Sequence, residues 1–162
     1  MLFPAILVLE DGSVMEGIGF GSKQQSVGEI VFNTSMSGYQ EIITDPSYAK
    51  QIIAFTHPHI GNTGINDEDN ESDNIFASAI VIKDLPKNYS NWRANQSLES
   101  FLLSKSTIGI SNIDTRALTA KLREHGSLKA CIAPGGKESL SEANDALNQF
   151  SGLEGLDLAK EV

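Results

Sequence analysis

The sequence predicts a single α/β domain whose helices lie mainly in the second half of the chain. Three observations support this class: a hairpin signal near the N-terminus, several short apolar runs typical of buried strands, and three later segments with helical spacing. The chain has 162 residues, of which 40% are hydrophobic and 20% charged, so it can bury enough apolar surface to offset the entropy lost on folding. We therefore expect one compact domain over residues 1–150.

The first two expected strands form a β-hairpin. Between them, the stretch from Glu10 to Ser13 contains the dipeptide Asp-Gly, which is a strong signal for a tight turn. The strands expected in the middle of the chain are nearly continuous apolar runs, which suit strands buried on both faces in a layered sheet. The expected strands are 5–10, 14–20, 29–33, 51–56, 75–82, 108–113 and 130–133.

Capping signals accompany two of the expected helices. Ser139 and Glu142 have the spacing of a capping box, in which each side chain bonds the backbone N–H group of the other residue. Asp114 can cap the first turn of the preceding helix, and Gly126 can end it. We expect both helices to pack on the sheet. The expected helices are 97–105, 115–125 and 140–150.

The net charge of −9 argues against two classes of partner. Binding to nucleic acid needs Lys and Arg to displace phosphate counterions, and an anionic membrane surface also attracts basic proteins. The N-terminal apolar run is short, lacks a basic region and is closed by Asp11 and Gly12, so it indicates a strand and not a signal peptide. We expect a cytoplasmic protein that binds neither nucleic acid nor membrane. The single cysteine, Cys131, fits a reducing compartment.

Two segments could contribute metal ligands, but neither has a full set. His57 and His59 would point to the same face of an extended segment, yet no third His or Cys lies near them, and His125 ends a predicted helix. The acidic stretch 66–74 lacks the glycine of an EF-hand loop and is expected to be a solvated loop. We expect no metal site in the chain.

A structural role is the simpler explanation for two further segments. Cys131 lies in an apolar run without the flanking glycines of a nucleophile elbow, so we expect a buried thiol with no catalytic role. The turn 59–64 contains two glycines, but it matches no phosphate-binding pattern and has no basic residue beside it. We therefore expect no catalytic residue in these 162 residues.

The most unusual stretch is 28–48, where an expected strand leads into a loop rich in hydroxyl, amide and aromatic side chains. Such a composition is costly to bury without hydrogen-bond partners, and binding residues are common on loops that a rigid scaffold carries. A polar loop closed by a turn at Asp45, Pro46 and Ser47 explains it equally well. The residues alone leave both interpretations open.

The same stretch, GEIVFNTSMSGYQEIITDPSY, closely resembles the opening of the small subunit of glutamine-dependent carbamoyl-phosphate synthetase. The resemblance continues through LEDG at 9–12, THPHIGNTGIND at 56–67, DLP at 84–86, SNWR at 90–93 and IDTRALTAKLREHG at 113–126. The last segment, GLEGLDLAKEV at 152–162, resembles the part that leads into the second domain of the family.

The resemblance implies a subunit that supplies ammonia from glutamine to a large subunit, which makes carbamoyl phosphate from it with bicarbonate, ATP and a divalent metal, for arginine and pyrimidine synthesis. It implies a three-layer β/β/α swivelling domain that holds no cofactor and packs on a class I glutamine amidotransferase domain. It also implies that the serine of the D-P-S-Y motif, here Ser47, borders the pocket for L-glutamine at the domain boundary.

The family's Cys-His-Glu machinery belongs to the second domain, and Cys131 does not match its nucleophile motif. We therefore expect residues 151–162 to be a connector toward that domain, and residues 1–162 alone to be inactive. One alternative is a stand-alone docking or binding module of the same fold. A weaker one is a swivelling phosphotransfer enzyme that uses His57 or His59.

Overall fold

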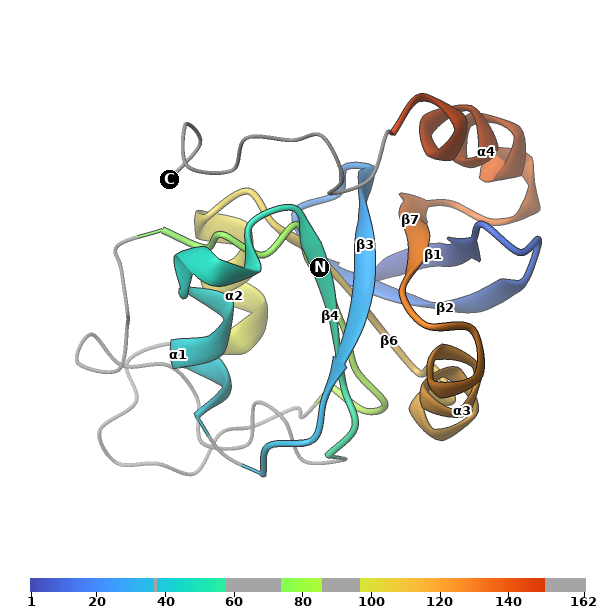
Figure 1. The fold of residues 1–162 in the computed structure, drawn as a ribbon. Coiled ribbons are helices and arrows are strands. Elements are labelled where there is room, and N and C mark those ends of the chain that lie inside the picture. The colour runs from blue at the N-terminus through green and yellow to red at the C-terminus, as the bar shows by residue number, and fades with distance from the viewer. Residues whose placement is uncertain (37, 58–73, 86–96, 151–162) are drawn as a thin grey trace.

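The computed structural model describes residues 1–36, 38–57, 74–85 and 97–150, and its strands close into a barrel (Figure 1). The order around the barrel is β1-β2-β6-β5-β4-β3-β7, with β7 paired again to β1. The mixed α/β class is therefore confirmed. The strands are β1 (Phe3–Leu9), β2 (Val14–Gly21), β3 (Ser26–Asn33), β4 (Gln51–Phe55), β5 (Ala79–Val81), β6 (Ile108–Ser111) and β7 (Leu128–Pro134).

The helices lie outside this barrel. Helix α3 (Thr115–His125) has the predicted bounds, and α2 (Leu98–Ser104) and α4 (Leu140–Gln149) lie within the predicted ranges. The structure adds a short helix, α1 (Tyr39–Ile43), and two 3₁₀ helices, η1 (Pro46–Tyr48) and η2 (Lys137–Ser139). Within the described ranges, no helix is long and apolar enough to cross a membrane.

Half of the barrel is a parallel sheet and the other half is antiparallel. Strands β3, β4, β5 and β6 pair in parallel, whereas β1, β2 and β7 make antiparallel pairs with their neighbours. The parallel strands therefore end at the same rim of the barrel, which is the end nearest α3 in Figure 1. Closure also leaves no edge exposed among the described strands, because each of them has a neighbour on both sides.

Alternate residues of the strands fill the barrel interior, together with two leucines of α3. The opposite strand faces are covered in two places: α1 and α2 pack over the β4–β5 side, and α4 packs over β1 and β7. This burial on both faces explains the continuous apolar runs in the sequence. The largest interior side chains include Leu7, Leu9, Ile30, Ile52, Ile108 and Ile132.

The three-layer β/β/α description implied by the resemblance is not confirmed, because the strands close into one barrel. Two local expectations also differ from the structure. The expected strand 75–82 is shortened to β5, because the N–H groups of Phe76 and Ala77 donate to the carbonyl of Ile43 and not to a neighbouring strand. Part of the expected loop forms α1, whose short length makes it dependent on the burial of Tyr39 and Ile43.

The predicted helix caps are confirmed in one case and wrong in another. The Asp114 carboxylate accepts a hydrogen bond from the Ala117 N–H group at 3.0 Å, as predicted. The capping box of α4 does not form, because Ser139 already has helical dihedral angles after η2. Its hydroxyl instead donates to the carbonyl of Pro134 at 2.7 Å.

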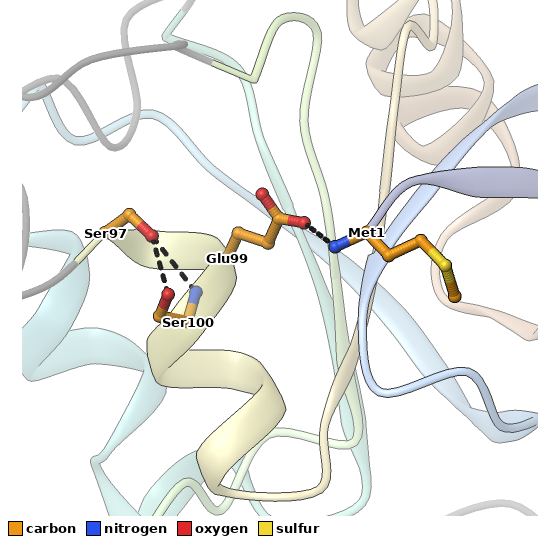
Figure 2. A network of polar contacts seen from close by, with 4 residues as sticks. All are labelled: Met1, Ser97, Glu99 and Ser100. Atoms are coloured by element: carbon orange, nitrogen blue, oxygen red, sulfur yellow. Dashed lines mark hydrogen bonds and ion pairs between the residues drawn. The ribbon is translucent and has the colours of Figure 1, made fainter.

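Helix α2 has a serine cap that the sequence analysis did not predict. The Ser97 hydroxyl accepts a hydrogen bond from the Ser100 N–H group at 3.1 Å, as Figure 2 shows. In the same first turn of α2, the Glu99 carboxylate pairs with the terminal amine of Met1 at 2.6 Å. The beginning of the chain is thus held beside the first turn of α2.

The first hairpin is joined to α3 by Asp11. Its carboxylate accepts a hydrogen bond from the Ser13 N–H group at 2.9 Å and pairs with Lys121 Nζ at 2.9 Å. These contacts lower the pKa of Asp11 to about 2, and the hydrogen bond from Ser13 has a larger effect than the contact with Lys121. Because the folded pKa lies below the ordinary value of roughly 3.9, the contacts stabilise the fold above about pH 4, and that contribution is lost as the pH falls through 2.

Replacing Asp11 with asparagine is expected to lower the free energy of unfolding by about 0.5 to 1 kcal/mol at pH 7. The amide oxygen can still accept the Ser13 bond, so the loss is mainly the exposed ion pair with Lys121. Urea denaturation from pH 7 to pH 2 should show the difference between the two proteins shrinking below pH 4. A difference that stays constant over this range would contradict the assignment.

Candidate functional site

The predicted substrate-binding residue, Ser47, lies in η1, directly before β4. The Asp45 carboxylate accepts a hydrogen bond from the Ser47 N–H group at 2.9 Å, and Pro46 occupies the first turn of η1. The Asp-Pro-Ser turn expected from the sequence is therefore confirmed. The Ser47 side chain is exposed, and its hydroxyl bonds no residue in the described part of the chain. The turn fixes the backbone and leaves the hydroxyl available to a ligand.

The neighbouring Tyr48 connects this turn to the end of β3. The side-chain amide of Asn33 donates to the Tyr48 hydroxyl at 3.3 Å, and its Oδ1 accepts from the Ser35 N–H group at 2.8 Å. The Tyr48 ring is half-buried against the cluster beneath α1 and α2. The polar groups of stretch 28–48 are thus partly paired with one another, while Ser47 stays exposed on the surface.

A cleft of about 450 Å³ opens at the other end of β4. Thr34, Thr56 and Lys83 lie just after the carboxyl ends of β3, β4 and β5, and Thr115, Arg116 and Arg123 of α3 form the facing wall. Ligands commonly bind outside the carboxyl ends of parallel strands. We call this feature the basic cleft, since three cationic side chains line it and Asp114 is its single carboxylate among the described lining residues.

The basic cleft was not predicted from the sequence. Its residues come from separate segments that meet only when β3, β4 and β5 pair in parallel. The available signal was that Thr34, Thr56 and Lys83 each follow an apolar strand, while Asp114 begins a helix. That signal becomes useful only once the strand order is known.

The other residues singled out in the sequence do not gather into a site where the structure describes them. Cys131 is fully buried beneath α4, and desolvation raises its pKa to about 11, so the prediction of a buried thiol is confirmed. His57 is half-buried after β4, and His125 is exposed at the end of α3. His59, the turn 59–64 and residues 66–73 lie outside the described residues. In the described part of the chain, no group of three or more His, Cys, Asp or Glu residues is placed to hold a metal ion.

Residues 7–132 match the family described as carbamoyl-phosphate synthase small chain, CPSase domain. The chain belongs to this family. The matched segment includes Ser47, the basic cleft and Cys131, so it covers both candidate sites. The prediction drawn from the resemblance is thereby confirmed at the level of the family.

The chain is also similar over nearly its whole length to curated proteins named carbamoyl phosphate synthase small chain. The chain is 52% identical over its whole length to the relative from Pseudomonas aeruginosa, covering 43% of that protein. It is 54% identical to the relative from Vibrio parahaemolyticus, with 98% of this chain and 42% of that protein covered. It is also 54% identical to the relative from Haemophilus ducreyi, with 100% and 44% covered. The chain thus spans about two fifths of the length of the family members it matches.

Proposed function

We propose that these 162 residues form the N-terminal part of the glutamine-using subunit of carbamoyl-phosphate synthase. The observation that carries this proposal is the family match over residues 7–132, together with whole-chain identity above 50% to proteins named as the small chain. In this proposal, a class I glutamine amidotransferase domain supplies the Cys-His-Glu machinery. A large subunit uses the ammonia with bicarbonate, ATP and a divalent metal.

Several further properties belong to the same proposal. The subunit works in the cytoplasm as part of a heteromer that serves arginine synthesis, pyrimidine synthesis or both. Residues 151–162 connect to the amidotransferase domain, and the domain over 1–150 holds no cofactor of its own. We also propose that the barrel is a closed variant of the three-layer swivelling arrangement, since α1 and α2 add a helical layer over the β4–β5 side.

Within this function, Ser47 borders the glutamine pocket and bonds the substrate through its hydroxyl. Two features support that role. The hydroxyl is exposed and makes no hydrogen bond within the described residues, so binding glutamine breaks no existing contact. The Asp45 carboxylate holds the Ser47 backbone at 2.9 Å, which lowers the conformational entropy lost when the substrate binds.

In the intact subunit, Ser47→Ala is expected to weaken glutamine binding by about 0.5 to 1.5 kcal/mol, the usual range for one hydrogen bond. The KM for glutamine should then rise roughly 2- to 12-fold. Steady-state glutaminase kinetics measure this change. Since Ser47 is exposed, its replacement should leave the free energy of unfolding within about 0.5 kcal/mol of wild type.

The matched control is Ser127→Ala, which removes an exposed hydroxyl between α3 and β7. That variant should keep the wild-type KM. A wild-type KM in Ser47→Ala would remove Ser47 from the glutamine pocket, and an equal rise in both variants would show that the effect is not local.

A further inference from the structure

The basic cleft has three cationic side chains that lack a counter-ion among the described residues. Lys83, Arg116 and Arg123 line it, and none of them forms an ion pair with a carboxylate in the part of the chain that the structure describes. This is unusual in a chain with 21 acidic residues and only 12 Lys and Arg. Three unpaired cations on one concave surface attract a negatively charged ligand.

Neutral donors face the same space. Thr115 is only 3% exposed and lines the cleft, yet its hydroxyl makes no hydrogen bond among the described residues. Among the described residues, every side-chain oxygen that is closed off from solvent has a hydrogen-bond partner. The Thr115 hydroxyl has no such partner, so it is open to the cleft that Thr115 lines. A hydroxyl that lines a cleft and has no partner among the described residues is available to a ligand or an ordered water.

The first turn of α3 adds backbone donors. Asp114 caps the N–H group of Ala117 only, so the N–H groups of Thr115 and Arg116 have no acceptor among the described residues. Helix α3 has 11 residues, and its dipole places partial positive charge at this end. The Asp114 carboxylate offsets part of this charge, but it is committed to the cap.

The cleft walls are held in place by hydrogen bonds and a ring contact. The Asn112 N–H group donates to the carbonyl of Lys83 at 2.7 Å, which joins the end of β5 to the segment before α3. The Thr56 hydroxyl donates to the carbonyl of Asn33 at 3.3 Å, and this bond fixes the adjacent strand ends. The Arg123 guanidinium lies 5.3 Å from the centre of the Phe32 ring. These contacts fix the backbone beside Lys83 and Thr56 and hold the Arg123 guanidinium against Phe32 before any ligand arrives.

We infer that the basic cleft is a binding site for a small oxyanion, of the class of phosphate or a phosphorylated metabolite. Guanidinium groups, hydroxyls and helix N-terminal N–H groups are the donors that phosphate oxygens accept in proteins. The site lies beyond the carboxyl end of β4, whereas Ser47 lies before its beginning, so it is separate from the proposed glutamine contact. The inference does not depend on glutamine use.

A divalent cation fits this lining poorly. Metal ions such as Mg²⁺ need several carboxylate or carbonyl oxygens, and the described lining residues include one carboxylate against three cations. An acidic segment of a protein partner would meet the same cations, but the Thr115 hydroxyl and the first N–H groups of α3 add donors close together, which suit the clustered oxygens of a small anion.

The test uses inorganic phosphate as the probe and calorimetric titration of the intact subunit at constant ionic strength. Saturable binding of one phosphate is expected. Arg116→Gln should weaken it about tenfold, because it removes a charge-assisted hydrogen bond, and Thr115→Val should weaken it several-fold while keeping the side-chain shape. The matched control is Lys105→Gln, which removes an exposed cation at the end of α2, and it should change the affinity less than about twofold.

Two results would overturn the inference. One is non-saturable binding, or equal weakening by Arg116→Gln and Lys105→Gln, because either outcome means general charge attraction. The other is a loss of assembly with a protein partner in Arg116→Gln while phosphate binding is unchanged, which would assign the cations to a protein contact. Thermal unfolding of each variant shows that the fold is kept, and the KM for glutamine reports separately on the proposed function.

Discussion

Replacing Phe20 with alanine is expected to lower the free energy of unfolding by about 3 to 5 kcal/mol, the range for truncating a buried phenylalanine. Phe20 is fully buried in the cluster that joins β2 to α2. Phe20 is paired with Gly109 on β6, and the Phe20 ring lies directly over that glycine. The ring therefore fills the space that a side chain at position 109 would need. Urea denaturation measures the loss, and a change below about 1 kcal/mol would contradict this packing.

A double-mutant cycle tests the contact itself. Gly109→Ala places a methyl group against the Phe20 ring, and such overpacking costs about 1 to 3 kcal/mol. In the Phe20→Ala background the same methyl group enters the space that the ring leaves, so its cost should fall or reverse. Additive effects of the two substitutions would show that the residues do not interact.

Gly21→Ala is expected to destabilise the protein by about 2 to 4 kcal/mol, since two costs act together. Gly21 has a φ of 77°, and a Cβ atom there would lie 2.6 Å from the carbonyl oxygen of Thr107. That oxygen cannot move freely, because it accepts a hydrogen bond from Ser22 at 2.9 Å. The measurement is the urea midpoint at constant m-value.

Gly12→Ala is the matched control for this prediction. Gly12 also has a positive φ, 92°, but a Cβ atom there would have no neighbour within 4 Å. Gly12→Ala should therefore lower the free energy of unfolding only by the strain of a positive φ, about 1 kcal/mol. If both variants lose the same stability, the overlap with Thr107 contributes nothing and the account of the β2–β6 contact is wrong.

The sequence predicted most elements because each one carries a local signal. The central strands β4, β5 and β6 are apolar on both faces, and the structure explains this pattern: one face fills the barrel and the other is largely covered by helices. Helix α3 was predicted with its observed bounds, since Asp114 and Gly126 mark its two ends.

Closure of the barrel could not be predicted in the same way. It depends on the pairing of β1 with β7, more than 100 residues apart, and on the parallel alignment of β3 with β4. Neither leaves a local pattern. The short helix α1 was missed because its N-cap residue, Gly38, has no side chain that could signal a cap. The predicted Ser139 cap does not form because the extra turn η2 precedes α4.

The two candidate sites also differ in whether a local sequence pattern reveals them. Ser47 lies in a contiguous motif, so a resemblance within one stretch of sequence was enough to select it. The basic cleft joins Thr56, Lys83 and Arg116 from distant segments, and only the parallel alignment of the strands brings them together. Sites of the second kind require the topology before they can be seen.

We propose that residues 1–162 border the glutamine site and that another domain supplies the nucleophile. Glutamine hydrolysis by the 162-residue chain alone tests it most directly, with ammonia release as the readout. The account predicts no turnover above background, because the one cysteine, Cys131, is a buried thiol with a pKa raised to about 11. Turnover should appear only when the amidotransferase domain is supplied. Glutamine hydrolysis by the chain alone would contradict the account.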